Sequence, residues 1–478
     1  MLNLQLVSDT PAFFSDICEV VRLFFPDALL SPEDGEEQLL HTQRVEGDEW
    51  VETWRLRGRE VIHRAPAVQG GLEEKRHMKR AVKTGCYLLM RELSGMTPPW
   101  GSLTGIRPTR LLYEALEKGM DPAAGRRWLE RDFFVAPDKT GLLADILDMQ
   151  KGLSEQDPTR CDVYVGIPFC TTRCAYCSFS SGELGKGELV EPYIRALLWE
   201  MEACARLIRE KGIRPRAFYM GGGTPTALNA GQLAKVLGAA RELFPGCVER
   251  TVEAGRPDTI DEERLGVLRD MGVTRISVNP QTFSDETLGR IRRGHSARDT
   301  LRAFDLARRM GFGNINMDLI CALPGEGTGD FARSLETCIG LEPESVTVHT
   351  LAIKRSSKLH EGGYRQADAG TAGRMVDLAR ERLTAGGWRP YYLYRQKYMA
   401  GNLENVGYCK PGKVCLYNIG NMEETANVLA LGAGAITKWL FPGERRIERA
   451  PNVKNIQEYI ARTDEMVSRK RRLIGGKP

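Results

Sequence analysis

Short apolar runs and longer amphipathic segments alternate along the middle of the chain, from about residue 161 to residue 385. Short apolar runs that end at glycine, proline or polar residues are typical of buried strands, and longer segments with helical spacing are typical of helices. The pattern predicts strands at Asp162–Val165, Ala217–Met220, Arg250–Glu253, Arg275–Val278, Asn314–Ile320 and Ser345–His349. It predicts helices at Leu189–Lys211, Asn229–Leu243, Asp261–Met271, Ala297–Met310, Asp330–Ile339 and Thr371–Ala385.

Six strand–helix units in succession predict an α/β fold with a parallel sheet that either opens as a doubly wound sheet or curls toward a barrel. In both folds the functional residues lie at the carboxyl ends of the strands. Each expected strand is indeed followed by polar or glycine residues that suit a ligand. They are the cysteine loop 170–177, the glycine run 221–223, Glu253, Asn279 with Gln281, Asp318 and His349.

The segment before residue 156 has a different pattern and is expected to form a separate α/β module. A helix is predicted at Pro11–Phe25, paired strands at Gln43–Arg57 and Arg59–His63, and a long amphipathic helix at Lys75–Leu93. The polar stretch Gly152–Thr159 is typical of a linker. We therefore expect domains at 1–155, 156–390 and 391–478, and we find no catalytic constellation in the first.

Composition excludes several classes of protein. The 478 residues, with 42% hydrophobic and 27% charged residues, are typical of a globular protein of more than one domain. A net charge of +4 does not indicate nucleic acid as a partner. The sequence shows no signal peptide and no apolar run long enough to span a bilayer, so a cytoplasmic location is expected.

Cysteines are scattered along the chain except in one cluster, Cys170, Cys174 and Cys177, which follows the first expected strand and Pro168. Three thiolates on irregular backbone can converge on one metal centre. A disulfide is disfavoured because nothing else indicates secretion. Zinc is the stronger alternative, but zinc knuckles favour C-x2-C pairs and no second pair follows at that spacing. A [4Fe–4S] cluster is favoured, and three cysteines would leave one iron open to a small molecule.

The other strand ends offer groups that suit a nucleotide-like ligand. The glycines 221–223 let a ligand approach the backbone closely. Glu253 could accept hydrogen bonds from ribose hydroxyls, or it could instead pair with Arg256 or Arg275. His295 and His349 are interpreted as polar residues with satisfied hydrogen bonds rather than as catalytic bases.

Taken together, these motifs resemble those of the radical S-adenosylmethionine superfamily. The segments YVGIPFC, CAYCSF, YMGGGTPT, VEAGRPDTI, SVNPQTF, RRGHS and NMDLICALPGE are similar to the oxygen-independent coproporphyrinogen III oxidase group. The GIRPTR loop and the N-terminal module resemble its longer branch, coproporphyrinogen dehydrogenase HemZ. The resemblance covers about residues 101 to 440. It implies a partial (βα)6 TIM-like barrel of radical SAM type, with the N-terminal module and a C-terminal extension.

The resemblance also implies a cofactor set. Cys170, Cys174 and Cys177 would ligate a [4Fe–4S] cluster, whose open iron would hold the amino and carboxylate groups of S-adenosylmethionine. One or two molecules of S-adenosylmethionine are implied. The residues that would bind it are Tyr164, Tyr176, Gly222, Gly223, Thr224, Glu253, Gln281, Arg293, Asp318, Ala352 and Ile436.

The implied reaction belongs to porphyrin and haem biosynthesis. A 5′-deoxyadenosyl radical would start the oxidative decarboxylation of coproporphyrinogen III propionates to the vinyl groups of protoporphyrinogen IX. A low-potential electron donor such as a flavodoxin or ferredoxin is the implied protein partner. Because the tetrapyrrole carries carboxylates, Lys354, Arg355 and Arg395 are candidates for binding it.

Two departures from the oxidase pattern keep a second function open. The archetypal oxidase has a fourth cysteine where this chain has Phe179, and a histidine where it has Gly166. Haem chaperones on the same scaffold also lack that cysteine, so a haem-binding protein with little oxidase activity is the alternative. In the C-terminal region, Cys409 and Cys415 flank KPGKV and are expected to be free thiols rather than metal ligands.

Overall fold

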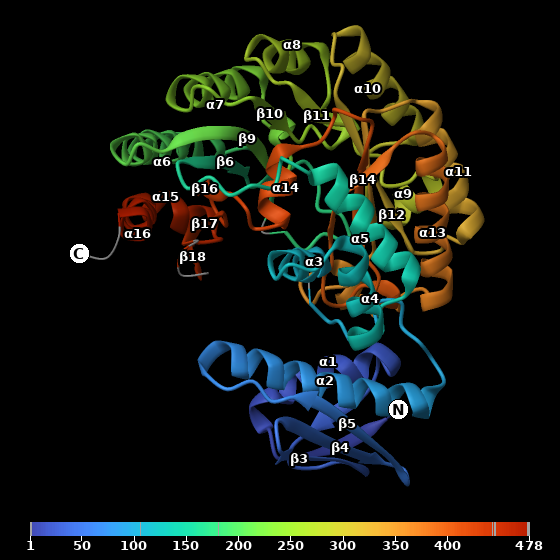
Figure 1. Cartoon of the computed structure of the whole chain (residues 1–478). Helices are drawn as coiled ribbons and strands as arrows, with labels where there is room; N and C mark the ends of the chain where they lie inside the picture. Colours follow the sequence, from blue (N-terminus) through green and yellow to red (C-terminus); the bar gives the residue numbers. More distant parts are fainter. Residues whose placement is uncertain (1, 106, 180, 442, 444–445, 476–478) are drawn as a thin grey trace. The chain divides into compact units, whose positions relative to one another are not determined.

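The computed structural model describes residues 2–105, 107–179, 181–441, 443 and 446–475. Two compact units make up the chain. One contains Met1–Ala144 and Gly401–Leu403, and the other contains Asp145–Ala400 and Glu404–Pro478 (Figure 1). Ile106, within the GIRPTR loop, lies outside the described residues. The three domain boundaries expected from the sequence stay predictions.

The first unit is built on a five-stranded sheet of order β2-β1-β3-β4-β5. Strand β1 pairs parallel with β2 and β3, and the other pairs are antiparallel. Helices α1 (Phe14–Phe24) and α2 (Gly71–Ser94) cover one face, and Trp54 and Tyr87 are fully buried in the core between the layers (Figure 1). The strands are β1 Asn3–Ser8, β2 Leu29–Ser31, β3 Glu37–Glu46, β4 Glu49–Leu56 and β5 Arg59–Pro66.

The prediction of one strand in this module was wrong. The segment Gln43–Arg57 is not continuous, because the chain reverses between β3 and β4. Gly47 lies at the turn with φ +59°, a conformation that glycine adopts without steric penalty. Helices α3 (Pro108–Glu117), α4 (Pro122–Phe133) and α5 (Pro137–Gln150) follow, and the last two had not been predicted. Each begins with proline, whose missing N–H has no partner in a first helical turn anyway.

The second unit contains a sheet of order β14-β15-β13-β12-β11-β10-β9-β6-β16-β17-β18. The six strands expected from the sequence are consecutive neighbours in it and are all parallel, as predicted. Helices α6, α7, α8, α10, α11 and α13 lie along its outer face (Figure 1). The strands are β6 Arg160–Ile167, β9 Arg214–Gly222, β10 Glu249–Val252, β11 Arg275–Ser277, β12 Ile315–Cys321, β13 Ser345–Thr350, β14 Arg389–Tyr394, β15 Asn405–Cys409, β16 Asn427–Leu431, β17 Ile436–Phe441 and β18 Arg446–Pro451.

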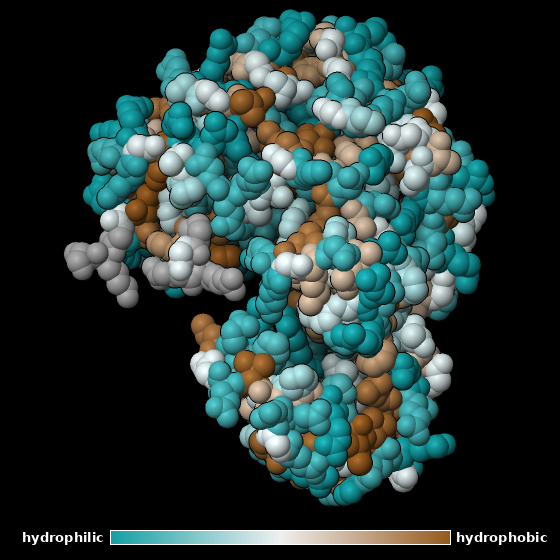
Figure 2. All heavy atoms as spheres, in the orientation of Figure 1, coloured by the Kyte–Doolittle hydropathy of each residue, from teal (hydrophilic) through white to brown (hydrophobic). Residues whose placement is uncertain are grey.

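The helices of the second unit agree with the predicted segments to within a few residues and include several short additional ones. They are α6 Val190–Glu210, α7 Ala230–Leu243, α8 Glu262–Asp270, α9 Asp285–Arg290, α10 Ala297–Arg309, α11 Thr328–Gly340, α12 Lys358–Glu361, α13 Ala369–Ala385, α14 Leu416–Met422, α15 Ile456–Ala461 and α16 Thr463–Gly475. Among the described residues, no helix combines the length and apolar character that a membrane span requires. Hydrophilic residues cover most of the face shown in Figure 2.

The C-terminal region extends both edges of this sheet. Strand β16 adds in parallel beside β6, so that seven neighbouring strands run the same way, and β17 and β18 follow in antiparallel. At the other edge, β15 pairs antiparallel with β13, and β14 pairs antiparallel with β15. The C-terminal region therefore forms part of the same layer as the strand–helix units.

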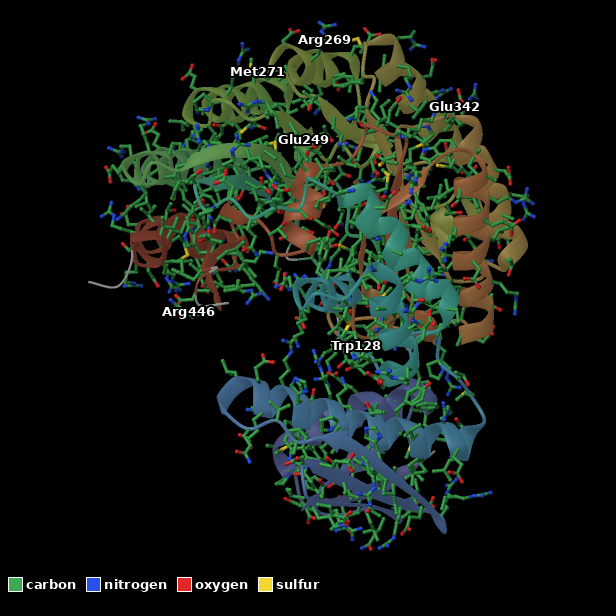
Figure 3. The ribbon with its side chains drawn as sticks, viewed as in Figure 1. Trp128, Glu249, Arg269, Met271, Glu342 and Arg446 are labelled. Atoms are coloured by element: carbon green, nitrogen blue, oxygen red, sulfur yellow. The ribbon has the colours of Figure 1, made fainter. Side chains whose placement is uncertain are left out.

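Helix α14 lies at the amino ends of the parallel strands and is held there by buried polar groups. Figure 3 labels Glu249 close to this helix. The Glu249 carboxylate accepts hydrogen bonds from the thiol of Cys415 at 3.2 Å and from the backbone N–H of Leu416 at 3.0 Å. The Arg216 guanidinium pairs with fully buried Asp162 at 2.6 Å. Tyr417 of α14 stacks on Tyr219 of β9, with ring centroids 4.4 Å apart. The amino ends of the parallel strands are thus filled, which leaves their carboxyl ends for a site.

Candidate active site

The three cysteines lie on a loop that is closed by a short ladder of its own. Strand β7 (Phe169–Cys170) pairs with β8 (Gly182–Glu183). Within the loop, the N–H of Cys177 donates to the carbonyl of Cys174 at 3.1 Å. All three residues are free cysteines, and Cys174 is buried with 7% exposure. The loop therefore presents the three side chains from one short, internally bonded segment at the carboxyl end of β6.

Hydrogen-bond donors from neighbouring strand ends surround the sulfurs. Thr224 Oγ1 donates to Cys170 Sγ at 3.5 Å, and Arg293 Nη1 donates to Cys174 Sγ at 3.6 Å. Arg256 Nη1 donates to the same Cys174 sulfur at 3.8 Å. Donors of this kind favour the thiolate form that ligates an iron–sulfur cluster, and they tune its potential. The residues fit a cluster by this criterion. Among the described residues, no group of three or more His, Cys, Asp and Glu is arranged to hold a single metal ion.

Arg256 is a site residue that sequence reasoning missed, because it was considered only as a partner for Glu253. Its guanidinium pairs with Asp258 at 3.0 Å and donates to the carbonyl of Thr172 at 3.0 Å. Its side chain is 3% exposed. Arg256 therefore ties the cysteine loop to the carboxyl end of β10. The available signal was its position three residues after Glu253, at the same strand end.

The glycine run brings the end of β9 against the start of the cysteine loop. The N–H of Gly223 donates to Ile167 O and that of Thr224 donates to Phe169 O, both at 2.7 Å. A Cβ on Gly223 would lie 2.6 Å from the Phe169 carbonyl oxygen, and Gly222 has φ +105°. These glycines are needed for close backbone approach. The N–H groups of Gly223 and Thr224 are thus occupied by carbonyl groups of the protein's own backbone.

Glu253 has neither of the arginine partners considered for it. Its carboxylate accepts a hydrogen bond from the hydroxyl of Tyr219, while Arg275 donates to Ser345 and to the carbonyls of Lys413 and Val414. Burial raises the pKa of Glu253 to about 7, and the nearby Asp318 charge adds to the increase, while the Tyr219 hydrogen bond opposes it. The carboxyl group can thus change its charge near neutral pH.

Asp318 and Gln281 lie next to each other on β12 and the end of β11. The Asp318 carboxylate accepts hydrogen bonds from Asn279 Nδ2 at 2.7 Å and Asn316 Nδ2 at 2.8 Å, and His349 Nε2 is 3.7 Å away. Gln281 is 7% exposed and has φ +68°. Its side-chain Oε1 is buried and has no hydrogen-bond partner among the described residues. Such an oxygen is an acceptor for a ligand.

Arg293 and Tyr176 lie close to the cysteines. Arg293 Nη2 donates to the carbonyls of Gly255 at 3.2 Å and Asn279 at 2.8 Å, so its head group spans two strand ends. Burial raises the pKa of Tyr176, and the charge of the Arg293 guanidinium opposes this increase. Burial lowers the pKa of His295 to about 4, so this residue is neutral at physiological pH. Neither of its ring nitrogens has a hydrogen-bond partner among the described residues, contrary to the expectation of a satisfied histidine.

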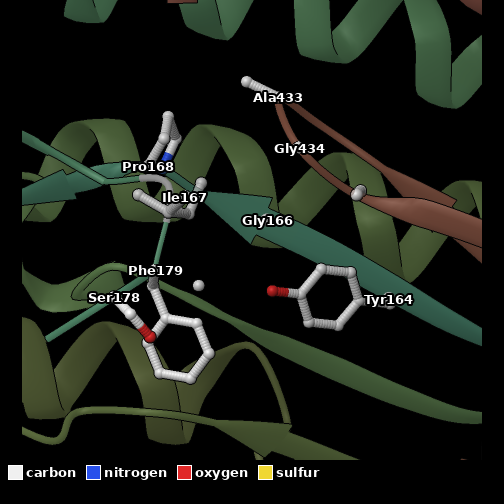
Figure 4. A pocket seen from close by; sticks show the side chains of 10 residues that line it. Tyr164, Gly166, Ile167, Pro168, Ser178, Phe179, Ala433 and Gly434 are labelled. Carbon is white, nitrogen blue, oxygen red and sulfur yellow. The ribbon is translucent and has the colours of Figure 1, made fainter. Parts of the chain in front are cut away.

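A cavity of about 170 Å³ lies beside the cysteine loop (Figure 4). Tyr164 points its hydroxyl toward Ile167 and Phe179 across this space (Figure 4). Of the predicted binding residues, Tyr164 and Gly222 line this cavity. Phe179 and the loop after β16, which are not among the predicted binding residues, also line it. The lining residues are Tyr164, Gly166, Ile167, Pro168, Ser178, Phe179, Gly222, Ala433, Gly434 and Ala435.

Two predicted residues lie at the margin of this arrangement. Ile436 begins β17 directly after the cavity-lining Ala435 and is 49% exposed. Ala352 follows β13 and forms an isolated bridge with Met399. The structure therefore brings nine predicted residues together with the cysteines at the strand ends and leaves these two beside them.

Comparison with known proteins agrees with this fold and site. A family model described as the radical SAM superfamily matches residues 164–338. The structure of coproporphyrinogen III oxidase HemN from Escherichia coli superposes with a TM-score of 0.52 at 23% identity, covering 66% of this chain and 72% of HemN. The fold and the three-cysteine loop define a radical S-adenosylmethionine protein, a class that uses a [4Fe–4S] cluster and S-adenosylmethionine.

Proteins similar in sequence identify the family within this class. The chain is 38% identical over 412 residues to the "oxygen-independent coproporphyrinogen-III oxidase-like protein HemZ" of Bacillus subtilis, covering 83% of this chain and 82% of HemZ. It is also 35% identical over 305 residues to the haem chaperone HemW of the same organism, covering 62% and 75% of the two chains. The chain belongs to the HemZ-like family of coproporphyrinogen oxidase-like radical SAM proteins.

Proposed function

We propose that this chain catalyses the oxygen-independent oxidative decarboxylation of coproporphyrinogen III to protoporphyrinogen IX. The observation that carries the proposal is the 38% identity to HemZ over 82% of that protein's length. Side-chain donors at the strand ends that hydrogen-bond to the sulfurs of Cys170 and Cys174 support it.

In this proposal Cys170, Cys174 and Cys177 would hold the cluster, and the strand-end residues around them would hold S-adenosylmethionine. With one electron from a low-potential donor, these cofactors would supply the radical chemistry that converts a propionate side chain to a vinyl group, with release of CO2 and of one electron to an acceptor. The protein contributes orientation and exclusion of water. Arg256 and Arg293 donate hydrogen bonds to the sulfur of Cys174, and Thr224 donates one to the sulfur of Cys170.

We assign S-adenosylmethionine contacts to the polar groups that the structure leaves available beside the cysteines. The Gln281 oxygen has no other partner among the described residues, and Glu253 in its ionised form accepts hydrogen bonds from ribose hydroxyls. Tyr164 and Gly222 line the adjoining cavity. The remaining members of the proposed set are Tyr176, Gly223, Thr224, Arg293, Asp318, Ala352 and Ile436.

Basic residues for the anionic substrate are expected on the segment after β13. This segment is tied to the cysteine loop, because Arg173 Nη2 donates to Ser356 O at 2.8 Å and Leu359 N donates to Ala175 O at 3.0 Å. Arg355 is exposed there, and Lys354 is half-buried. Arg395 fits this role poorly, because it is 2% exposed.

Replacement of Arg355 tests the substrate assignment. Arg355→Ala should raise the KM for coproporphyrinogen by about tenfold, the effect of losing one charge-assisted hydrogen bond. Cleavage of S-adenosylmethionine in the absence of substrate should stay unchanged. The exposed Arg302→Ala, on α10, is the matched control. Equal KM values in the two variants would contradict the assignment.

A haem chaperone is the second candidate function, and HemW relatives together with the missing fourth cysteine favour it. Phe179, at that position, is 68% exposed and lines the cavity. A chaperone would bind haem and produce little vinyl product.

One anaerobic experiment separates the two functions. The reconstituted protein is mixed with dithionite, S-adenosylmethionine and coproporphyrinogen III, and 5′-deoxyadenosine and porphyrins are followed by chromatography. Vinyl product with matching 5′-deoxyadenosine, both lost in Cys174→Ala, is the expected result. Cys247→Ala serves as the control, because Cys247 precedes β10 at the opposite end of the strands. Deoxyadenosine without decarboxylation, combined with stable haem binding, would favour the chaperone.

A further inference from the structure

The loop after β16 forms one wall of the cavity beside the cysteines, and its backbone is held by side chains of α6. The N–H of Gly432 donates to Glu200 Oε2 at 2.8 Å, and the N–H of Ala433 donates to the Tyr193 hydroxyl at 3.1 Å. The next two residues, Gly434 and Ala435, line the cavity together with Ala433. Glu200 and Tyr193 are seven residues apart, so they lie on the same face of α6.

Glu200 is the centre of a fully buried network. Its Oε2 also accepts from the Tyr459 hydroxyl at 2.6 Å, and its Oε1 accepts from Asn452 Nδ2 at 2.9 Å and Lys470 Nζ at 2.7 Å. Lys470 Nζ donates in addition to Asn452 Oδ1 at 2.6 Å. Both charged side chains have 0% exposure. A buried ion pair is tolerated only when its hydrogen bonds are satisfied in this way.

Tyr193 packs against Tyr459 of the network, with ring centroids 5.2 Å apart, and contacts the other cavity wall. The Tyr193 hydroxyl donates to the carbonyl of Gly166, which lines the cavity, at 2.6 Å. Its ring packs edge to face against the ring of Phe169, the residue before the first cysteine, with ring centroids 5.4 Å apart. Gly432 has φ +100°, and a Cβ there would lie 2.5 Å from both the Gly166 oxygen and the Tyr193 hydroxyl. The two walls are therefore clamped at a spacing that allows no side chain at residue 432.

We propose that Glu200, Asn452 and Lys470 are positioning residues for the cofactor cavity, so that helix α16 sets the wall against which S-adenosylmethionine binds. The inference rests on the proposed cofactor site. A buried network that served only to join helices would end on helix groups. This one ends on the Gly432 amide, directly before the cavity-lining Ala433, and the adjoining Tyr193 bonds to the carbonyl of cavity-lining Gly166.

A charge cycle on the cluster-loaded full chain tests the proposal. Lys470→Met leaves Glu200 buried without a counter-charge, Glu200→Gln leaves Lys470 unpaired, and the double variant is neutral again. Amide hydrogen exchange over 429–437 is measured together with the Kd for S-adenosylmethionine and the iron content. Each single variant should speed exchange in this segment and raise Kd by about tenfold, with the double variant within about threefold of the parent. Iron content should stay unchanged.

Tyr193→Phe tests the proposal even if the charge variants fold poorly, and Arg308→Met is its control. Tyr193→Phe removes only one hydroxyl and should still weaken S-adenosylmethionine binding and expose the Ala433 amide. Arg308→Met breaks an ion pair with Glu344 elsewhere in the unit and should leave both readouts unchanged. Unchanged exchange or an unchanged Kd in Tyr193→Phe would overturn the proposal. A cluster-loaded parent protein that binds no S-adenosylmethionine would instead overturn the proposed function. Amide hydrogen exchange over residues 429–437 would then test only whether Glu200 and Tyr193 hold the loop after β16.

Discussion

Glu253 shows how the environment of a single side chain can make a site sensitive to pH. The carboxyl group lies among Tyr219, Asp318 and the glycine turn, and burial raises its pKa to about 7. Below this pKa the group is neutral, and above it the group is a carboxylate. Only the carboxylate offers all its lone pairs to ribose hydroxyls.

Affinity for S-adenosylmethionine should therefore rise with pH. We expect about a tenfold increase between about pH 6 and about pH 8, because the ionised fraction of a group with this pKa grows by that factor. Glu253→Gln should remove the dependence. Titration calorimetry at several pH values measures it, with Glu326→Gln as the control, another carboxyl whose pKa burial raises. An unchanged slope in Glu253→Gln would contradict the assignment.

At the scale of single residues, the sequence predicts those residues whose candidate role can be recognised from the neighbouring residues in the chain. The three cysteines follow from their spacing, and Glu253 and Asp318 follow from their places at strand ends. The sequence places Arg256 at a strand end but does not reveal its contact with Thr172, because the two residues are 84 positions apart. Lys470 likewise meets Glu200 across 270 positions. No local pattern distinguishes such a lysine from a solvated one.

At the scale of elements, helix caps illustrate what local sequence determines. Asn229 caps α7 by accepting from the N–H of Gln232 at 2.9 Å, and the Gln232 side chain returns a bond to the Asn229 N–H at 3.1 Å. This reciprocal pair satisfies two N–H groups that the helix itself leaves unpaired.

Asn229→Ala should lower the free energy of unfolding of this unit by about 1 kcal/mol. Urea unfolding followed by circular dichroism gives the value. Lys235→Ala, at a half-exposed position of the same helix, should change it by less than about 0.5 kcal/mol. Equal losses in the two variants would mean that the cap contributes nothing specific.

Element order in the sheet was only partly predictable. The right-handed crossover rule orders the strands from β6 to β13 correctly, because each follows its neighbour through a helical connection. The buried run Asn427–Leu431 indicates a strand, but nothing in it indicates that it pairs with Cys161–Val165. Similarly, the polar alternation around Gly47 did not reveal that the chain turns there.

At the scale of the whole molecule, the two units have separate hydrophobic cores, one around Trp54 and Tyr87 and one within the large sheet. Chains with more than one core commonly unfold in more than one step. We therefore expect two transitions in differential scanning calorimetry of the cluster-loaded protein.

S-adenosylmethionine should raise the temperature of only one transition, because a ligand stabilises the unit that binds it. At one hundred times Kd the gain is about 2.7 kcal/mol. Trp54→Phe, in the first unit, should lower the other transition alone. A single transition that responds to both changes would show that the two units unfold together.

The buried bond between Glu200 and Lys470 also bears on how the protein matures during synthesis. Chains emerge from the ribosome amino end first, and domains begin to fold as they appear. The cysteine loop therefore emerges long before Lys470 does. If helix α16 supports the cavity wall as proposed, the wall lacks this support until α16 docks on α6, and S-adenosylmethionine should bind only after that step.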